Sequence, residues 1–262
     1  MNKEPLVSII MNCYNGEKYL KAALKSAINQ KYNNWELIFW DNRSKDNSKK
    51  ILKSFNEKRF KYYFAKKFTS LYTARNLAIA KSKGKLISFL DVDDLWLPNK
   101  LILQVPLFKN KNVGVVYSKL LILNQSNNKK KVHIKNDLPE GNISRSIISN
   151  YSIGIITTVI RKNILSKIKK RFDDRFTHIG DFDFFIRLSK ICKYRAVQIP
   201  TAIYRAHGNN LTTIEKDKAI KEFEIWLSEN KKKIKKNEHK KIQLMIDRKK
   251  IINYKMQNDY YR

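Results

Sequence analysis

Apolar and polar residues follow one another in blocks over the first 95 residues, and these blocks predict strands and helices in turn. Four short segments are apolar and rich in β-branched or aromatic residues, which indicates strands at 6–11, 35–40, 60–64 and 85–90, the last of them a buried parallel strand. The intervening patterns predict helices at 17–29, 46–55 and 71–80. Strands that alternate with helices in this way predict crossover connections and a parallel sheet.

The pattern after residue 95 is less regular. It predicts a helix at 98–109, a strand at 113–123, a polar loop at 124–139, a buried strand at 153–160, a helix that starts near Asp181, and short strands at 194–198 and 202–205. From residue 216 onward the pattern is helical and basic. We therefore expect one domain over residues 1–215, with halves at 1–95 and 96–215, followed by a basic helical tail at 216–262.

Polar side chains follow three of the predicted strands at the points where these strands end: Asn12 and Tyr14, then Asp41 and Asn42, then Asp91 and Asp93. Because the carboxyl ends of parallel strands meet at one edge of a sheet, we expect a binding crevice there. Asp91 and Asp93 are two residues apart in an extended segment, so their side chains point the same way. Hard oxygen ligands in that arrangement suit Mg²⁺ or Mn²⁺ that carries a substrate phosphate. The alternative is that Asp93 or Asp94 only caps the helix that follows.

The formal net charge of +32 has two explanations. One is a polyanionic partner, such as nucleic acid or anionic lipid. The other is the Lys, Asn and Ile enrichment that an AT-rich genome produces. The charge is spread over the body of the chain as well as its tail, which favours a general attraction to anionic surfaces over the reading of a base sequence.

Two cysteines, Cys13 and Cys192, make no disulfide framework and have no metal-ligand spacing, which indicates a reducing compartment. The N-terminal segment lacks the apolar centre and cleavage site of a signal peptide. No stretch approaches the roughly 20 apolar residues that cross a bilayer. We therefore expect a cytoplasmic protein, at most peripheral on the inner face of the membrane.

Six segments, taken together and in this order, resemble the family 2 glycosyltransferases: 7–16, 30–44, 74–76, 87–94, 180–183 and 204–207. The resemblance covers about residues 5 to 210. It implies a GT-A fold, an α/β architecture with a mixed, mainly parallel sheet flanked by helices. It also implies an inverting transfer of a sugar from a nucleotide-diphosphate sugar, with a UDP-sugar favoured, to a hydroxyl of a glycan or lipid-linked glycan in surface polysaccharide or glycolipid synthesis. The implied cofactor is Mn²⁺ or Mg²⁺.

The resemblance also implies roles for individual residues. Nucleotide-sugar binding falls to Asn12, Tyr14, Asp41, Asn42, Arg75 and Asp91. Metal binding falls to Asp93 and His207. Asp181 matches the general base that takes the proton from the attacking hydroxyl, and Asp183 is its competitor.

Three positions depart from the family pattern. Asn42 stands where a second Asp is common, Arg43 replaces a usual Gly, and Gly180 replaces a usual Glu. These departures leave open the nucleotide base and a GT-A fold that has lost activity. A nucleic-acid-binding protein is the main alternative of another class, although most aromatic residues fall in core-like patterns, which argues against a nucleic-acid partner. A nicotinamide-dependent enzyme is disfavoured because the first turn lacks G-x-G-x-x-G.

Overall fold

Four parallel strands form the N-terminal half of the sheet in the computed structural model, which describes residues 4–258. The central strand β1 (Val7–Cys13) pairs with β2 (Trp35–Asp41) on one side and with β4 (Leu86–Phe89) on the other. Strand β3 (Phe60–Phe64) extends the sheet beyond β2. Every residue of β2 and β4 is buried, as expected of strands covered on both faces. The predicted parallel arrangement is confirmed.

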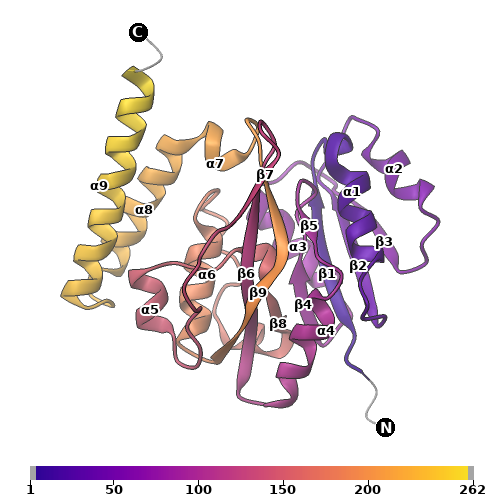
Figure 1. Cartoon of the computed structure of the whole chain (residues 1–262), viewed down its shortest axis with the longest axis horizontal. Helices are drawn as coiled ribbons and strands as arrows, with labels where there is room; N and C mark the ends of the chain where they lie inside the picture. Colours follow the sequence, from indigo (N-terminus) through magenta and orange to yellow (C-terminus); the bar gives the residue numbers. More distant parts are fainter. Residues whose placement is uncertain (1–3, 259–262) are drawn as a thin grey trace.

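Helices α1 (Glu17–Ile28), α2 (Ser48–Ser54) and α3 (Leu71–Lys81) connect these strands (Figure 1). Helix α1 buries the apolar residues that recur at helical spacing in its sequence: Leu20, Ala23, Leu24 and Ala27. The Ser70 side chain accepts a hydrogen bond from the Thr73 N–H and so caps α3 at its N-terminus.

The C-terminal half adds a second group of strands, of mixed direction. Strand β8 (Val159–Arg161) runs antiparallel to β4 and to β6 (Val113–Asn124). Strand β6 then pairs in parallel with β9 (Lys193–Ala206), and β5 (Leu95–Trp96) closes this edge of the sheet. The order of the strands is β3-β2-β1-β4-β8-β6-β9-β5, and β7 (Lys129–Val132) pairs with β6.

The predicted loop at 124–139 is wrong in part, because it contains β7. All four residues of β7 are exposed, so the strand rests on backbone pairing with β6 and leaves no apolar pattern. A turn at Asn127 and Asn128 makes the pairing possible. Asn128 has a φ of 55°, and the Asn127 side chain accepts a hydrogen bond from the Lys129 N–H at 3.0 Å.

The predicted strand at 153–160 is also wrong over most of its length. Residues Ile155–Thr157 form the 3₁₀ turn η2, and only the end of the segment joins β8. The hydroxyls of Thr157 and Thr158 each donate to a backbone carbonyl three residues earlier, at 2.7 Å. These local bonds compete with strand pairing, which explains the turn.

Two further boundaries differ from the predictions. The helix at 98–109 is α4 (Lys100–Gln104) followed by the 3₁₀ helix η1 (Val105–Lys109), since Pro106 cannot donate the bond that would continue an α-helix. The two short strands near residue 200 are one strand, β9. Its register against β6 shifts on either side of Lys119, where Pro200 lacks an N–H for the ladder.

The remaining elements are α5 (Ser144–Ser149), η3 (Lys162–Lys167), α6 (Gly180–Ser189), α7 (Leu211–Ile214), α8 (Lys216–Asn230) and α9 (Lys236–Asn258). Helices α8 and α9 pack against each other at the edge of the molecule away from α1 and α2 (Figure 1). Trp226 of α8 and Ile246 of α9 are buried in the main core. None of the helices within residues 4–258 is long and apolar enough to cross a membrane.

Candidate active site

The strand order reverses between β1 and β4, because β2 and β3 follow on one side of β1 and β4 lies on the other. Open α/β sheets bind ligands outside the carboxyl ends of strands at such a point. Residues Asn12 and Asp41 lie at adjoining strand ends, where Cys13 is directly opposite Asp41. The Asn42 N–H donates to the Cys13 carbonyl at 2.7 Å. The structure thus brings the polar ends of β1, β2 and β4 to one edge.

Asp41 and Asn42 are both buried and hydrogen-bonded within the protein. The Asp41 carboxylate accepts from the Ser44 N–H at 2.7 Å and from the Tyr62 hydroxyl at 2.9 Å. The Asn42 amide donates to the Thr69 carbonyl at 2.8 Å and accepts from the Thr69 N–H at 3.2 Å. Asn42 therefore fixes the loop that connects β3 to α3.

That loop carries an exposed aromatic residue to the end of β1. Phe68 is 58% exposed and Tyr14 is 51% exposed, and their ring centroids lie 4.8 Å apart in an edge-to-face arrangement. Two rings held together in solvent offer a stacking platform for a flat ligand. The Asn12 Nδ2 atom near this edge is buried and has no hydrogen-bond partner among the described residues.

Arg75 of α3 binds the segment that follows β4. Its guanidinium is almost fully buried and donates to the Asp91 carboxylate at 2.7 Å. Burial alone would lower the pKa of Arg75, but the charges of Asp91 and Asp181, together with Tyr72, raise it. Arg75 is therefore a fixed positive charge between two carboxylates.

Asp93 faces residues from the end of β9 and the segment after it. Its Oδ2 atom lies 3.2 Å from His207 Nε2 and 3.3 Å from Asn210 Nδ2. The His207 ring stacks on Tyr19 of α1, with the centroids 4.7 Å apart. Burial, together with the neighbouring charge of Asp91, raises the pKa of Asp93. A cation placed beside these carboxylates would offset that unfavourable crowding of negative charge.

Asp94 has a structural role. Its carboxylate accepts the Arg205 N–H at 2.9 Å, and the Arg205 side chain in turn donates to the Asp93 carbonyl. Burial raises the pKa of Asp94 well above its ordinary value. These contacts tie the end of β4 to β9 and so place Asp93 beside His207.

Asp181 lies in the first turn of α6, on the other side of Arg75. Its Oδ1 atom accepts the Phe182 N–H at 2.8 Å and lies 3.4 Å from the Tyr72 hydroxyl. Burial raises the pKa of Asp181, and the Arg75 charge opposes that rise. A carboxylate in this setting is a better proton acceptor than an exposed one.

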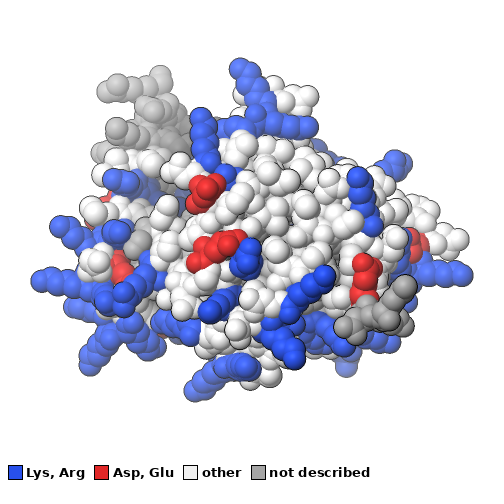
Figure 2. Space-filling view, turned by 60° about the horizontal axis from the view of Figure 1, so that its bottom comes forward, with Lys and Arg blue, Asp and Glu red and all other residues white. Residues whose placement is uncertain are grey.

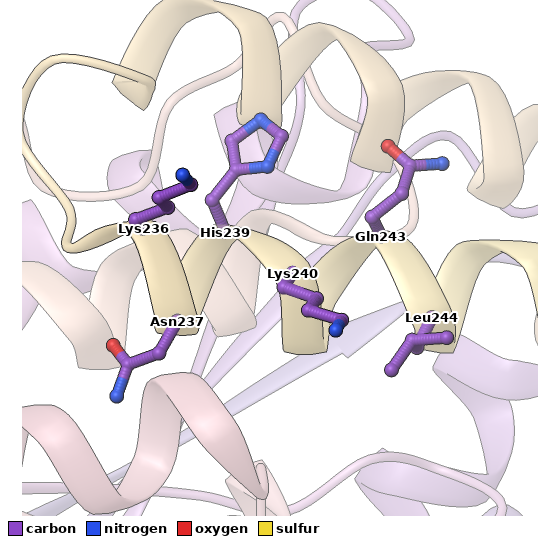
Figure 3. A pocket seen from close by; sticks show the side chains of 6 residues that line it. All are labelled: Lys236, Asn237, His239, Lys240, Gln243 and Leu244. Atoms are coloured by element: carbon purple, nitrogen blue, oxygen red, sulfur yellow. The ribbon is translucent and has the colours of Figure 1, made fainter.

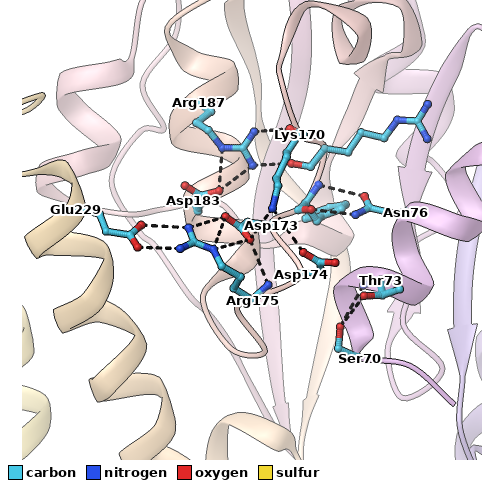
Figure 4. Close-up of polar contacts among 12 residues, drawn as sticks. Ser70, Thr73, Asn76, Lys170, Asp173, Asp174, Arg175, Asp183, Arg187 and Glu229 are labelled. Carbon is cyan, nitrogen blue, oxygen red and sulfur yellow. Dashed lines mark hydrogen bonds and ion pairs between the residues drawn. The ribbon is translucent and has the colours of Figure 1, made fainter.

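Asp183, two residues later, is occupied by structural contacts. One of its oxygens accepts from Arg187 at 2.8 Å and the other accepts from the Trp226 indole at 3.0 Å. Figure 4 shows that Arg187 of the same helix pairs with Asp183 and also donates to the carbonyl of Lys170. Both Asp183 oxygens are engaged, which separates it chemically from Asp181.

The family profile of glycosyl transferase family 2 matches residues 8–193 of this chain. The chain belongs to this family. A relative from Escherichia coli, the UDP-Glc:alpha-D-GlcNAc-diphosphoundecaprenol beta-1,3-glucosyltransferase WfgD, is 31% identical over 185 residues, which are 71% of this chain and 70% of the relative. The predicted family and enzyme class are confirmed.

Solved structures confirm the predicted GT-A fold. The S. aureus protein TarS (residues 1–349), in complex with UDP-GlcNAc, superposes with a TM-score of 0.69 at 16% identity, and covers 85% of this chain and 66% of its own. The mannosyltransferase PcManGT from Pyrobaculum calidifontis, in complex with GDP-Man and Mn²⁺, gives 0.65 at 14% identity, and covers 87% of this chain and 65% of its own. This chain therefore spans about two thirds of each neighbour.

The family resemblance implies a metal site, and the side chains near Asp93 show which residues could form it. Within residues 4–258, no three His, Cys, Asp or Glu residues are grouped so that they could hold a metal ion by themselves. Asp93 and His207 do lie together, and a carboxylate oxygen with an imidazole nitrogen suits Mn²⁺. The residues present fit a cation that takes its other ligands from water and substrate phosphates.

Several residues of this glycosyltransferase site were not predicted from the sequence: Tyr19, Phe68, Tyr72 and Asn210. Phe68 could have been noticed as a large apolar residue in a polar loop. Tyr72 shares one helical face with Arg75 at a spacing of three, which is a usable signal. Asn210 and Tyr19 act through contacts between distant segments, which no local pattern reveals.

Two surface hollows of the described residues lie away from this site. One hollow runs along α9, where Lys236, His239 and Gln243 project on one side and Lys240 and Leu244 on the other (Figure 3). A second hollow is lined by residues of α3 and the segment before α6: Asn76, Lys170, Arg171, Phe172 and Asp174. Neither includes a predicted site residue.

Proposed function

We propose that this protein is an inverting glycosyltransferase that moves the sugar of a UDP-sugar onto a hydroxyl of a lipid-linked glycan acceptor, in polysaccharide or glycolipid synthesis. The observation that carries the proposal is that Arg75 pairs with Asp91 at 2.7 Å while the charge of Asp181 also acts on Arg75. One helix thereby joins a site for a diphosphate to a carboxylate suited to proton transfer. WfgD, which uses UDP-Glc and a diphosphoundecaprenol-linked acceptor by its name, supports the choice of substrates.

The nucleoside would lie at the ends of β1 and β2. Tyr14 and Phe68 offer rings for the uracil, and Asn12 offers a buried amide N–H that no described residue engages. Asp41 and Asn42 are buried beside these strand ends, and Asn42 acts by holding the loop that carries Phe68. Because the Asn42 amide is already bonded, its difference from the common Asp does not by itself select a base.

In the transfer step, Asp181 takes the proton of the acceptor hydroxyl while the hydroxyl oxygen forms a bond to the anomeric carbon. The bond from that carbon to the β-phosphate oxygen breaks, and UDP leaves with the electron pair. Attack from the side opposite the leaving group inverts the configuration. Arg75 and Asp91 orient the donor, and the Arg75 charge opposes the rise in the pKa of Asp181 that burial causes.

Asp93 and His207 are the residues that would hold Mn²⁺ or Mg²⁺. When bound, the cation would supply positive charge for the leaving diphosphate. Asn210 and Tyr19 would hold His207 in place, because the Asn210 side-chain oxygen accepts the His207 backbone N–H at 2.6 Å and the Tyr19 ring stacks on the imidazole.

The acceptor proposal includes contact with an anionic membrane surface through α9. Three large aliphatic side chains of this helix are about half exposed: Leu244, Ile251 and Ile252. Basic residues surround them, including Lys240, Lys241 and Arg248. A helix with aliphatic and basic side chains on its outer face suits an interface that carries anionic headgroups.

Calorimetric titration of UDP, GDP and TDP tests the donor site. We expect UDP to bind with Mn²⁺ present and to lose at least tenfold in affinity without it or in Asp93→Ala. Asp174→Ala, an exposed Asp away from the crevice, is the control and should bind like wild type. Equal binding with and without Mn²⁺ in every variant would remove Asp93 from the metal site. Tight binding of a nucleic-acid oligomer with no nucleotide binding would contradict the function itself.

Transfer itself is tested with UDP-Glc and UDP-GlcNAc as donors and a GlcNAc-diphospho-lipid as acceptor. We expect turnover with one donor and a product whose anomeric configuration is opposite to that of the donor, as NMR would show. UDP binding without turnover on any acceptor would indicate a fold that has lost its activity.

A further inference from the structure

Tyr72 lies in the first turn of α3, and its hydroxyl contacts both the backbone and the carboxylate of Asp181. Its hydroxyl accepts the Asp181 N–H at 3.1 Å. The same hydroxyl lies 3.4 Å from Asp181 Oδ1 and 3.4 Å from the His178 carbonyl, and it can donate its proton to either oxygen. We propose that Tyr72 is a positioning residue that holds Asp181 in the orientation for deprotonating the acceptor. This inference rests on the proposed function.

Gly180 is the steric counterpart of Tyr72. A Cβ atom at position 180 would lie 2.5 Å from the nearest atom of the Tyr72 ring, closer than real contacts allow. The ring cannot easily move away, because it is buried and stacks on Phe172 at 5.3 Å between centroids. Tyr72 therefore excludes any side chain at position 180, including a carboxylate.

Asn76 holds the backbone of Phe172, the residue on which the Tyr72 ring stacks. Its amide donates to the Phe172 carbonyl at 2.9 Å and accepts the Phe172 N–H at 3.1 Å, as Figure 4 shows. Tyr72, Arg75 and Asn76 occupy one face of α3, at spacings of three and four residues. This face therefore orients Asp91 through Arg75 and Asp181 through Tyr72, from one rigid element.

The groups that face Asp181 are Arg75 and Tyr72 from α3 and Tyr151 from the segment before η2. Burial raises the pKa of Asp181, whereas Arg75, the Phe182 N–H and the Tyr72 hydroxyl lower it. Burial also raises the pKa of Tyr72 well above its ordinary value, so the hydroxyl keeps its proton. Removal of this hydroxyl would free the carboxylate to rotate and would raise the pKa of Asp181 further.

Tyr72→Phe tests the proposal because it keeps the ring against Gly180 and removes only the hydroxyl. Tyr194→Phe is the matched control. Tyr194 is also buried, and its hydroxyl donates at 2.9 Å to the Phe185 carbonyl, further along the same helix. The pH profiles of kcat and KM would be measured for both variants with the donor and acceptor that wild type turns over, and UDP affinity by calorimetry.

For Tyr72→Phe we expect kcat to fall about tenfold, as for loss of a hydrogen bond to a charged group. The acid limb of its pH profile should move to higher pH, since less of the base is ionised at a given pH. Donor KM and UDP affinity should match wild type. Tyr194→Phe should lose a similar amount of stability but keep the wild-type profile.

An unshifted acid limb with a kcat within twofold of Tyr194→Phe would overturn the positioning role. Equal losses in kcat and UDP affinity would also overturn it, because they indicate general disturbance of the fold. The proposed function fails by different results, namely no turnover by wild type, or full turnover by Asp181→Asn. The two failures are therefore distinguishable.

Discussion

Asp181 and Asp183 lie two residues apart on α6 and differ in their hydrogen-bond partners. Asp183 carries the contacts of a structural carboxylate, with Arg187 on one oxygen and Trp226 on the other. Asp181 has a neutral hydroxyl, a backbone N–H and a nearby positive charge. Acidic residues early in a helix are common, so neither position is informative without these partners.

We predict that Asp183→Asn lowers the free energy of unfolding by about 3 kcal/mol, since it leaves Arg187 without its carboxylate in a mostly buried setting. Urea denaturation would measure the loss. The folded variant should retain a kcat within a few fold of wild type, because Asp183 does not reach the substrate. A large loss of kcat with unchanged stability would contradict the structural role of Asp183.

The motif residues of the candidate site could be proposed from the sequence, whereas the residues that support them could not. Asp91, Arg75 and Asp181 belong to short patterns that resemble the family, and their chemistry suggested the roles. The spacing of Tyr72 from Arg75 was a usable signal, but the role of Tyr72 could not be predicted because its partner, Gly180, lies in a distant segment. The meaning of Gly180 emerges only when the Tyr72 ring fills the space beside it.

Helix α8 contributes to the site although it lies beyond the residues that the family profile matches. The Glu222 carboxylate accepts hydrogen bonds from the N–H groups of Thr177, His178 and Ile179 and from the Thr177 hydroxyl, at 2.7 to 3.1 Å. These residues lead directly into α6. A negative charge there also suits the positive end of the α6 dipole.

We predict that Glu222→Gln destabilises the protein by about 2 kcal/mol, because the new amide group faces N–H donors and leaves them unsatisfied. Glu224→Gln is the control, since Glu224 is more exposed and contacts only the exposed Lys250 among the contacts described. Urea denaturation of both variants measures the difference. Equal midpoints for the two variants would contradict the role of Glu222 in holding α6.

The hydrogen bonds to Glu222 make the stability of the protein depend on pH. Burial would raise the pKa of Glu222, but the hydrogen bonds from Thr177, His178 and Ile179 outweigh it and lower the pKa below 4.5. The stabilisation by ionised Glu222 is therefore present above pH 4.5 and is lost as the pH falls through the lower pKa that Glu222 has in the folded protein. Glu222→Gln should remove this part of the acid sensitivity.

At the scale of the whole molecule, the N-terminal half was predictable because three of its four strands, β1, β2 and β4, are almost wholly buried and so appear as continuous apolar runs. The strands of the C-terminal half were less predictable from the sequence. Strand β7 is exposed throughout, and β9 continues through Pro200 by shifting register. In both cases backbone pairing with β6 decides the structure, and side-chain pattern carries little of that information.

The charge of +32 is also a property of the whole surface. Figure 2 shows Lys and Arg side chains projecting all around the visible face, with few acidic ones among them. Such a surface attracts anionic membranes in general, so charge alone cannot orient the enzyme. The aliphatic side chains of α9 would provide the orientation.

We predict that the protein binds vesicles containing phosphatidylglycerol at low salt, and that added salt weakens the binding. Leu244→Gln combined with Ile251→Gln should weaken it several-fold. Ile102→Gln, at a similarly exposed position on α4, is the control and should bind like wild type. Sedimentation with vesicles measures the bound fraction. Binding that is unaffected by the α9 changes, or equal on neutral vesicles, would contradict the proposed surface.

The central claim is that Asp181 is the base of a UDP-sugar transfer, and the rate of UDP release by Asp181→Asn tests it most directly. We expect the rate to fall about a thousandfold, within the range for loss of a positioned general base. UDP affinity should stay within twofold of wild type, because Asp181 lies on the acceptor side. A rate within tenfold of wild type, in a variant that binds UDP normally, would contradict the assignment.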